Sequence, residues 1–278
     1  MAKGIFIGVS GAARKTTDAY IGVSGVARKV KNGFIGVSGV AREFWSGGTP
    51  SNFADLMSRA TLESIGGYDS STYTSSVHAY DLPTSKTCYV FGAINGSLCI
   101  SKLSGGSFTV LYRHDVDGNN TVSSYWPRID IDSLGTTAIL RYEDDSNFYY
   151  FYGGTIAAFS FDGVDDSVVD EMLSNLSLIV TDGRSSSSEA AVVISDTNVP
   201  TGSYIFAFYD NYVGISIYNG GGGTLPTSLF GNNGTNPYLC SIMWSSTHYA
   251  IYLYDGTFID NQIGGDYYGG SIMAMKSD

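Results

Sequence analysis

Charged residues, cysteines and long apolar segments are all scarce in this sequence. A charged fraction of 15% over 278 residues argues against a coiled coil or a helical bundle, both of which need abundant Ala, Glu, Lys and Leu. A hydrophobic fraction of 43% argues against a disordered chain. The remainder is rich in Gly, Ser, Thr, Asn, Asp and Tyr, which is the composition of an all-β protein with many turns.

The few cysteines and the lack of long apolar runs argue against disulfides, a zinc site and a membrane span. Cys88, Cys99 and Cys240 are odd in number and form no C-x-x-C pair, so we expect buried free thiols and neither a disulfide framework nor a zinc site. No stretch of roughly 18 apolar residues indicates a membrane span. The first residues lack the apolar core of a signal peptide. We therefore expect folding in a cytoplasm, without a membrane partner.

Charge is distributed unevenly along the chain. Residues 1–45 carry seven basic and two acidic residues. The remainder therefore carries eight basic and 24 acidic residues, a net charge of −16 in a chain whose total is −11. Because nucleic-acid phosphates need Lys and Arg, this acidic body argues against a nucleic-acid partner. A basic N-terminal module joined to an acidic body calls for a separate role for each part.

The N-terminal module is a threefold repeat. Ile7-Gly-Val-Ser-Gly-Ala-Ala-Arg-Lys15 recurs from Ile21 and from Ile35 with a period of 14 residues. This period fits two short strands with a tight Ser-Gly turn in each copy. We predict that residues 4–44 form one antiparallel meander, with further turns at Thr17-Asp18 and Lys31-Asn32; a stacked β-solenoid is the minor alternative.

The predicted register leaves one face of this meander almost without side chains. Gly22 faces Ala27, while Ile21 faces Arg28 on the other face, and the same pairs recur in each copy. A bare strip invites close approach by another backbone, so we predict a docking module, with capping of the following domain as the alternative. The predicted interface consists of Gly8, Ala13, Gly22, Ala27, Gly36 and Ala41, with Arg14, Arg28 and Arg42 on the opposite face.

These repeats carry a family resemblance. Together with the opening Met-Ala-Lys-Gly-Ile-Phe and the closing Ala41-Arg-Glu-Phe-Trp45, they resemble the I-G-V-x-G-V-A-R-K-V repeats of tailed-phage and prophage virion proteins from gut Firmicutes. The resemblance covers about 45 residues. It implies a phage structural or tail-associated protein, without an agreed activity, whose following region often resembles kelch-type propeller repeats.

The acidic body is predicted to be all-β. We assign residues 46–60 to a linker, with weak helical spacing over 53–65, and residues 61–278 to the body. Strand pairs start near residues 89, 137, 191 and 239, and Asn95-Gly96 is a strong hairpin signal. A spacing near 50 residues is that of a propeller blade. We therefore predict a small, degenerate β-propeller, with a β-sandwich or jelly roll as the alternative.

No motif in the body predicts catalytic, cofactor-binding or metal-binding residues. Residues 114–120 cluster oxygens that could hold Ca²⁺, but Trp126 stands where an EF-hand needs an acidic residue, which favours a solvated turn. Asp130 and Asp132 could form a glycosidase pair, although a structural role is favoured. Surface tyrosines beside Asp and Asn are typical of sugar- and protein-binding surfaces, with core packing as the alternative; these are Tyr149, Tyr150, Tyr152, Tyr267 and Tyr268.

The predicted function is therefore that of a structural virion protein and not an enzyme. The N-terminal repeat would dock it to other virion proteins, as a homo-oligomer or in many copies per particle. The β body would be displayed, most simply on the tail or fibre, to bind a host-surface glycan or protein. A capsid decoration protein is the first alternative, and a cell-surface polysaccharide-degrading enzyme is the second. The expected location is the virion, assembled in the host cytoplasm.

Overall fold

The computed structural model describes most of the chain as antiparallel β-strands. The described residues are 6–9, 12–15, 19–23, 26–30, 32–37, 40–46, 49–68, 72–114, 126–144, 147–183, 191–195, 199–220, 227–232, 239–244, 248–254 and 270–277. Strands make up 58% of the structure, with two short helices, which confirms the all-β fold class. Neither of these helices is long and apolar enough to cross a membrane.

The N-terminal repeat forms three hairpins with the predicted register. Gly8 pairs with Ala13, Gly22 with Ala27 and Gly36 with Ala41. The predicted Ser-Gly turns at residues 10–11, 24–25 and 38–39 lie outside the described residues. The hairpin strands are β1 (Phe6–Val9), β2 (Ala12–Lys15), β3 (Ala19–Val23), β4 (Val26–Val30), β5 (Asn32–Val37) and β6 (Val40–Ser46).

The prediction of one continuous meander is wrong for the described strands. Each hairpin is a separate two-stranded sheet, so β4 does not pair with β5 across the predicted turn at Lys31-Asn32. Asn32, predicted to lie in a turn, is instead the first residue of β5 and pairs with Ser46 beyond a bulge after Gly33. Only one residue then separates β4 from β5, too few for the two-residue turn that the meander requires.

Among its described residues, the body contains two five-stranded sheets and two smaller ones. The first five-stranded sheet has the order β11-β10-β9-β15-β7. It consists of β7 (Thr61–Tyr68), β9 (Cys88–Ile94), β10 (Ser97–Ser104), β11 (Ser107–His114) and β15 (Gly154–Ser160). The second has the order β20-β19-β18-β23-β16. It consists of β16 (Leu176–Gly183), β18 (Tyr204–Tyr209), β19 (Tyr212–Ile217), β20 (Thr227–Asn232) and β23 (Ser271–Ser277).

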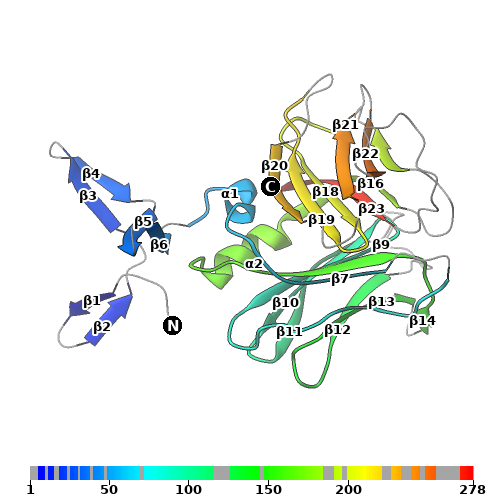
Figure 1. The fold of residues 1–278 in the computed structure, drawn as a ribbon, viewed down its shortest axis with the longest axis horizontal. Coiled ribbons are helices and arrows are strands. Elements are labelled where there is room, and N and C mark those ends of the chain that lie inside the picture. Colours follow the sequence, from blue (N-terminus) through cyan, green and yellow to red (C-terminus); the bar gives the residue numbers. More distant parts are fainter. Residues whose placement is uncertain are drawn as a thin grey trace.

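Each five-stranded sheet is paired with one smaller sheet and one helix. The first smaller sheet consists of β8 (Val77–Ala79), β12 (Trp126–Ile131), β13 (Ala138–Asp144) and β14 (Asn147–Tyr149). The second consists of β17 (Ala191–Ser195), β21 (Leu239–Trp244) and β22 (His248–Tyr254). Helix α1 (Phe53–Met57) precedes β7, and α2 (Asp166–Ser174) precedes β16. We call residues 53–161 the first half and residues 165–277 the second half (Figure 1).

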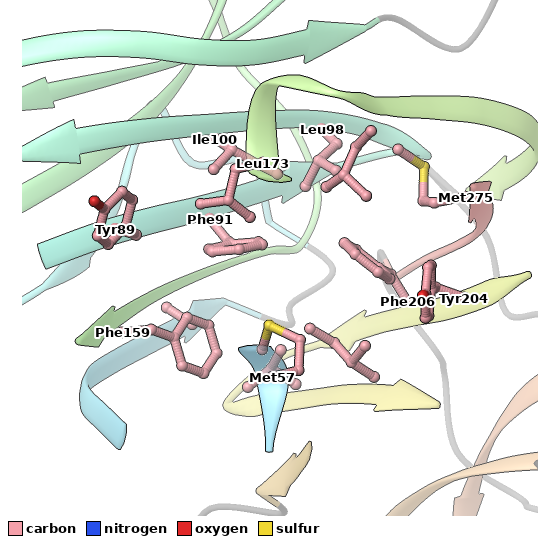
Figure 2. Close-up of a cluster of buried hydrophobic side chains, with 14 of the residues drawn as sticks. Met57, Tyr89, Phe91, Leu98, Ile100, Phe159, Leu173, Tyr204, Phe206 and Met275 are labelled. Carbon is pink, nitrogen blue, oxygen red and sulfur yellow. The ribbon is translucent and has the colours of Figure 1, made fainter. Parts of the chain in front are cut away.

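The hydrophobic core lies in three layers between these sheets. A central cluster joins the inner faces of the two five-stranded sheets with both helices, and Phe91 and Phe206 lie within it (Figure 2). One outer cluster fills the space between the first five-stranded sheet and its smaller partner, and another does so in the second half. Strands β9, β15 and β18 are consequently buried at every position, which explains why β9 and β18 lack the alternation of polar and apolar residues typical of a half-exposed strand.

This layering contradicts the predicted propeller and agrees with the sandwich alternative. The described strands do not form four-stranded sheets starting near residues 89, 137, 191 and 239; each half instead places a larger sheet against a smaller one. The four starts fall in β9, just before β13, in β17 and in β21. Two of these strands, β17 and β21, belong to one and the same sheet, so the spacing near 50 residues does not mark successive blades.

The segment that we assigned to a linker is partly core. Asn52 caps α1 by accepting a hydrogen bond from the backbone of Asp55, at 2.9 Å, and such a cap is the usual start of a short helix. Phe53, Leu56 and Met57 are at most 1% exposed. The expected helix over 53–65 therefore ends early, because β7 begins at Thr61.

Candidate interaction surfaces

The predicted N-terminal interface residues take equivalent places in the three hairpins. Each Gly of the strip lies opposite an Ala. Arg14, Arg28 and Arg42 lie opposite Ile7, Ile21 and Ile35, one position along the strands. Since neighbouring positions of a strand face opposite sides, the Gly/Ala pairs and the Arg/Ile pairs lie on opposite faces of each hairpin. The strip is thus present three times, in three separate sheets.

A patch of tyrosines stands out on the body. Among the side chains that the structure describes, Tyr73 is 61% exposed and Tyr150 is 70% exposed. The ring centroid of Tyr73 lies 4.0 Å from that of Tyr152. We call Tyr73, Tyr150 and Tyr152 the tyrosine patch. Of the tyrosines predicted from sequence, it contains two; the side chains of the other three, Tyr149, Tyr267 and Tyr268, are not among those described.

A short backbone bridge holds this patch in place. Thr74 and Phe151 exchange two hydrogen bonds of 2.9 Å, and Phe151 is only 4% exposed. With Phe151 directed into the core, Tyr150 and Tyr152 on either side of it face outward. Tyr73 was not among the predicted tyrosines, because an isolated Tyr in a Ser/Thr-rich segment shows no strand pattern. The patch depends on a pairing between residues 77 positions apart.

The tyrosine patch and the N-terminal module lie at opposite ends of the body. The chain enters the body through α1, at the left of the sandwiches in Figure 1. Strand β14, which directly precedes Tyr150, lies at the right edge of the same view. An attachment through residues 1–46 therefore leaves the patch at the far end from the attachment.

The predicted acidic pair has structural partners. Asp130 lies 2.7 Å from Arg128 and 3.7 Å from Arg141, within a charged group on the outer face of the first smaller sheet. Asp132 accepts hydrogen bonds from the backbone of Thr137 at 2.9 Å and of Thr136 at 2.7 Å. These bonds hold the pKa of Asp132 below its usual value, so it remains an ionised turn cap. The contacts favour the structural role over glycosidase chemistry.

A second cluster combines a hydroxyl, an amine and a carboxylate. Glu63 accepts hydrogen bonds from Lys86 and Ser160, and Lys86 also lies 3.2 Å from the Ser160 hydroxyl. Burial opposes the charge on Lys86, but the bond to Glu63 and nearby acidic charges outweigh it and raise its pKa. A protonated lysine is no general base, and Ser160 is only 1% exposed. The cluster therefore supports β7 and does not form a nucleophilic site.

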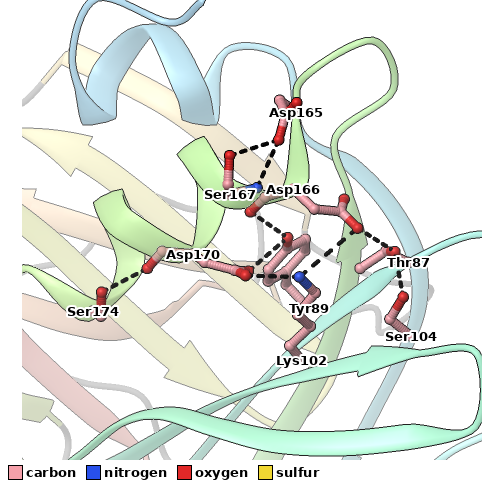
Figure 3. Close-up of polar contacts among 9 residues, drawn as sticks. All are labelled: Thr87, Tyr89, Lys102, Ser104, Asp165, Asp166, Ser167, Asp170 and Ser174. Carbon is pink, nitrogen blue, oxygen red and sulfur yellow. Dashed lines mark hydrogen bonds and ion pairs between the residues drawn. The ribbon is translucent and has the colours of Figure 1, made fainter.

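A polar network attaches α2 to the first half (Figure 3). Asp170 accepts a hydrogen bond from the Tyr89 hydroxyl at 3.0 Å and from Lys102 at 2.7 Å. Asp166 accepts one from Thr87 at 2.7 Å. Burial, followed by the nearby carboxylates, raises the pKa of Tyr89, so it stays a neutral donor. Every described member of this network has a partner, as expected of a structural contact.

Of the predicted cation loop the structure describes only the first residue, His114, and of the three cysteines it describes two side chains. His114 ends β11 with its ring nitrogens near the Tyr112 hydroxyl and the Gly96 carbonyl, and residues 115–125 lie outside the described part. No group of three or more potential metal ligands occurs among the described residues. Cys88 and Cys99 are free and buried, as predicted, and burial raises the pKa of Cys88 to about 11.

Comparisons with known proteins give no further guide to these surfaces. A scan against protein-family models, a search of curated proteins and a search of solved structures each found no match to this chain.

Proposed function

We propose that this chain is a structural virion protein of a tailed bacteriophage, docked through its N-terminal repeat and displaying its β body. The observation that carries the proposal is the threefold hairpin repeat with its bare Gly/Ala strip. The resemblance of the repeat to virion-protein repeats supplies the biological setting. The body contributes a buried apolar core that joins its two halves.

Isolated hairpins need a partner. A two-stranded sheet is at best marginally stable in water, and each hairpin leaves two strand edges available for pairing. The Gly/Ala strip allows another backbone to approach within van der Waals distance of the sheet. The arginine positions on the opposite face suit an acidic neighbour, either another virion protein or this chain's own acidic body.

The docking role is tested by filling the strip. Gly22→Leu combined with Gly36→Leu places side chains where the partner would pack, so we expect fewer copies in purified particles, while the body keeps its thermal unfolding transition. Thr109→Leu, at an exposed position of β11, is the matched control for an added leucine. Normal incorporation of the double variant would overturn the docking role. Copy number in the same particles separates a tail location, with at most a few dozen copies, from capsid decoration, with hundreds.

The tyrosine patch is the part of the body best suited to a host-surface ligand. Exposed tyrosine rings stack against sugar rings and offer a hydroxyl at their edge, and β14, which directly precedes Tyr150, lies at the end of the body away from the attachment. Because residues 46–278 carry a net charge of −16, a polyanionic ligand is disfavoured. The proposed ligand is therefore an uncharged cell-surface polysaccharide.

Two exposed tyrosines provide a matched test. Tyr73→Ala with Tyr150→Ala removes the patch, whereas Tyr80→Ala removes a tyrosine that is 57% exposed but follows β8 outside the patch. We expect the wild type and Tyr80→Ala to be retarded in gels containing dextran, mannan or galactan, and the double variant to migrate freely. Retardation by poly(glycerol phosphate) alone, or by none of these polymers, contradicts the ligand assignment without affecting the docking role.

A further inference from the structure

The two halves of the body have the same topology in the same chain order. Each begins with a short helix, and the first strand of each half, β7 or β16, lies at one edge of its five-stranded sheet next to the last strand, β15 or β23. The hairpin β9-β10 corresponds to β18-β19, and β11 corresponds to β20. In the smaller sheets, β8, β13 and β12 correspond to β17, β22 and β21. Only β14 lacks a counterpart among the described residues.

Irregularities in the strand pairing coincide as well. The β7-β15 pair has a bulge that leaves Glu63 unpaired, and the β16-β23 pair has one at Ile179. The β10-β11 pair shifts register between Ile100 and Ser101, and the β19-β20 pair does so between Ile215 and Ser216. Bulges are specific features of a fold and are retained within families. Their recurrence shows that the halves match residue by residue.

This match reveals a sequence similarity that is weak by itself. Residues 89–101 read YVFGAINGSLCIS and residues 204–216 read YIFAFYDNYVGIS, with 115 positions between equivalents. Residues 152–158 read YGGTIAA and residues 268–274 read YGGSIMA. In both hairpins the first turn residue, Asn95 or Asp210, has a positive φ, 49° or 46°. The left-handed conformation is uncommon outside glycine, so this agreement is specific.

The contacts between the halves are reciprocal. The Asn95-Gly96 turn of the first half lies on Gly183 of the second, where a Cβ would overlap the turn backbone. The turn at Asp210 of the second half lies in the same way on Gly67, the equivalent glycine of the first half. The equivalent residues Thr155 and Ser271 each bond to the opposing turn: Thr155 donates to the Asp210 carbonyl at 2.9 Å, and Ser271 accepts from the Gly96 amide at 2.8 Å.

Contacts in the central hydrophobic core are reciprocal in the same way. Tyr89 and Tyr204 are equivalent, and each contacts the helix that opens the other half: Tyr89 bonds to Asp170 of α2, and Tyr204 lies 4.7 Å from Phe53 of α1 between ring centroids. Phe91 and Phe206 are also equivalent, and their rings lie 6.4 Å apart at the centre of the core (Figure 2).

We propose that the body is a fused dimer, in which two copies of one ancestral sandwich unit, now joined in a single chain, meet through a self-complementary interface with approximate twofold symmetry. When residue i of one unit contacts residue j of the other, and j contacts i in return, the interface is of the kind that twofold dimers form. The partner that fits the inner face of each half is thus a second copy of the same unit.

Exchange of the two equivalent hairpins within the full chain tests this proposal. Residues 89–101 and 204–216 exchange places without changing the composition of the chain. We expect a monomer that unfolds in one cooperative transition, within about 10 °C of the wild-type Tm, since losses of a few kcal/mol shift Tm by that order in a domain of this size. The matched control exchanges residues 89–101 with residues 205–217. This shift of one residue turns each core side chain of the exchanged strands to the opposite face of its sheet.

The hairpin exchange could prevent folding merely through poor local packing. In that case a smaller exchange, limited to the turn residues, tests the proposal. Asn95-Gly96 and Asp210-Asn211 exchange places, leaving every strand unchanged. A retained unfolding transition with native-like near-UV circular dichroism supports the equivalence of the turns and their seats on Gly183 and Gly67. Loss of the fold, as in the slipped control, would overturn the proposal.

Discussion

The two halves of the body attach their covering helices through the same tyrosine but with different chemistry. Tyr89 holds α2 through its hydroxyl, bonded to Asp170, with Lys102 completing an ion pair. Tyr204 holds α1 through its ring, which meets Phe53 edge to face. The arrangement of the halves thus survives a change from polar to aromatic contacts. It depends on the steric fit of turns on glycines and on the shared inner faces, and less on individual bonds.

The largest effect should come from breaking the steric fit, and it should be equal in the two halves. Gly67→Ala and Gly183→Ala each place a Cβ inside the backbone of the opposing turn, and such overpacking typically costs 1–3 kcal/mol or more. We expect each variant to lose about 3 kcal/mol of unfolding free energy in urea. Gly231→Ala is the control, because the nearest atom to its Cβ would be 3.8 Å away. If either variant lost less than about 1 kcal/mol of unfolding free energy, the two glycines would not be equivalent.

A smaller effect should separate the two tyrosines. Tyr89→Phe removes a hydroxyl that donates to the Asp170 carboxylate, and hydrogen bonds to charged groups contribute about 1.5–3 kcal/mol. Tyr204→Phe keeps the ring contact with Phe53 and loses only a bond to the backbone of Ala54, for which we expect about 1 kcal/mol. Equal losses in urea unfolding would show that both helices are held by their rings.

The smallest effect should be an acid sensitivity confined to the first half. Burial raises the pKa of Glu63, but its bonds to Lys86 and Ser160 outweigh this, and the folded pKa lies below the ordinary value of a glutamate. A lowered folded pKa stabilises the protein above the unfolded pKa, and this stability is lost as pH falls through the folded value. Ile179 takes the equivalent place in the second half and cannot titrate.

Glu63→Gln measures this difference. We expect the wild type to lose up to about 1 kcal/mol more than the variant between roughly pH 5 and pH 2, since the pair is partly exposed. The measurement is the unfolding free energy in urea across that range. Parallel pH profiles for the two proteins would show that Glu63 contributes no acid sensitivity.

Local features were the ones that sequence reasoning predicted well. The register of the three N-terminal hairpins follows from a 14-residue repeat whose partners are at most 14 positions apart, and the Asn95-Gly96 turn follows from the conformational freedom of these residues. The tyrosine patch was predicted only in part, because Tyr73 reaches Tyr152 through a bridge across the fold. The duplication was missed, because few of its equivalent residues are identical.

By itself, the sequence determined the all-β class, the strand and turn chemistry, and the division into a basic repeat and an acidic body. These depend on composition, alternation and short-range turns. Only the tertiary structure decided that the N-terminal hairpins are separate, that the body is two sandwiches and not a propeller, and that Gly67 and Gly183 receive opposing turns. The physical reason is that the apolar pattern of a strand indicates that one of its faces is buried, but it does not indicate which sheet covers that face. That choice depends on contacts between residues far apart in the chain, such as Gly67 with Asp210 and Gly96 with Gly183.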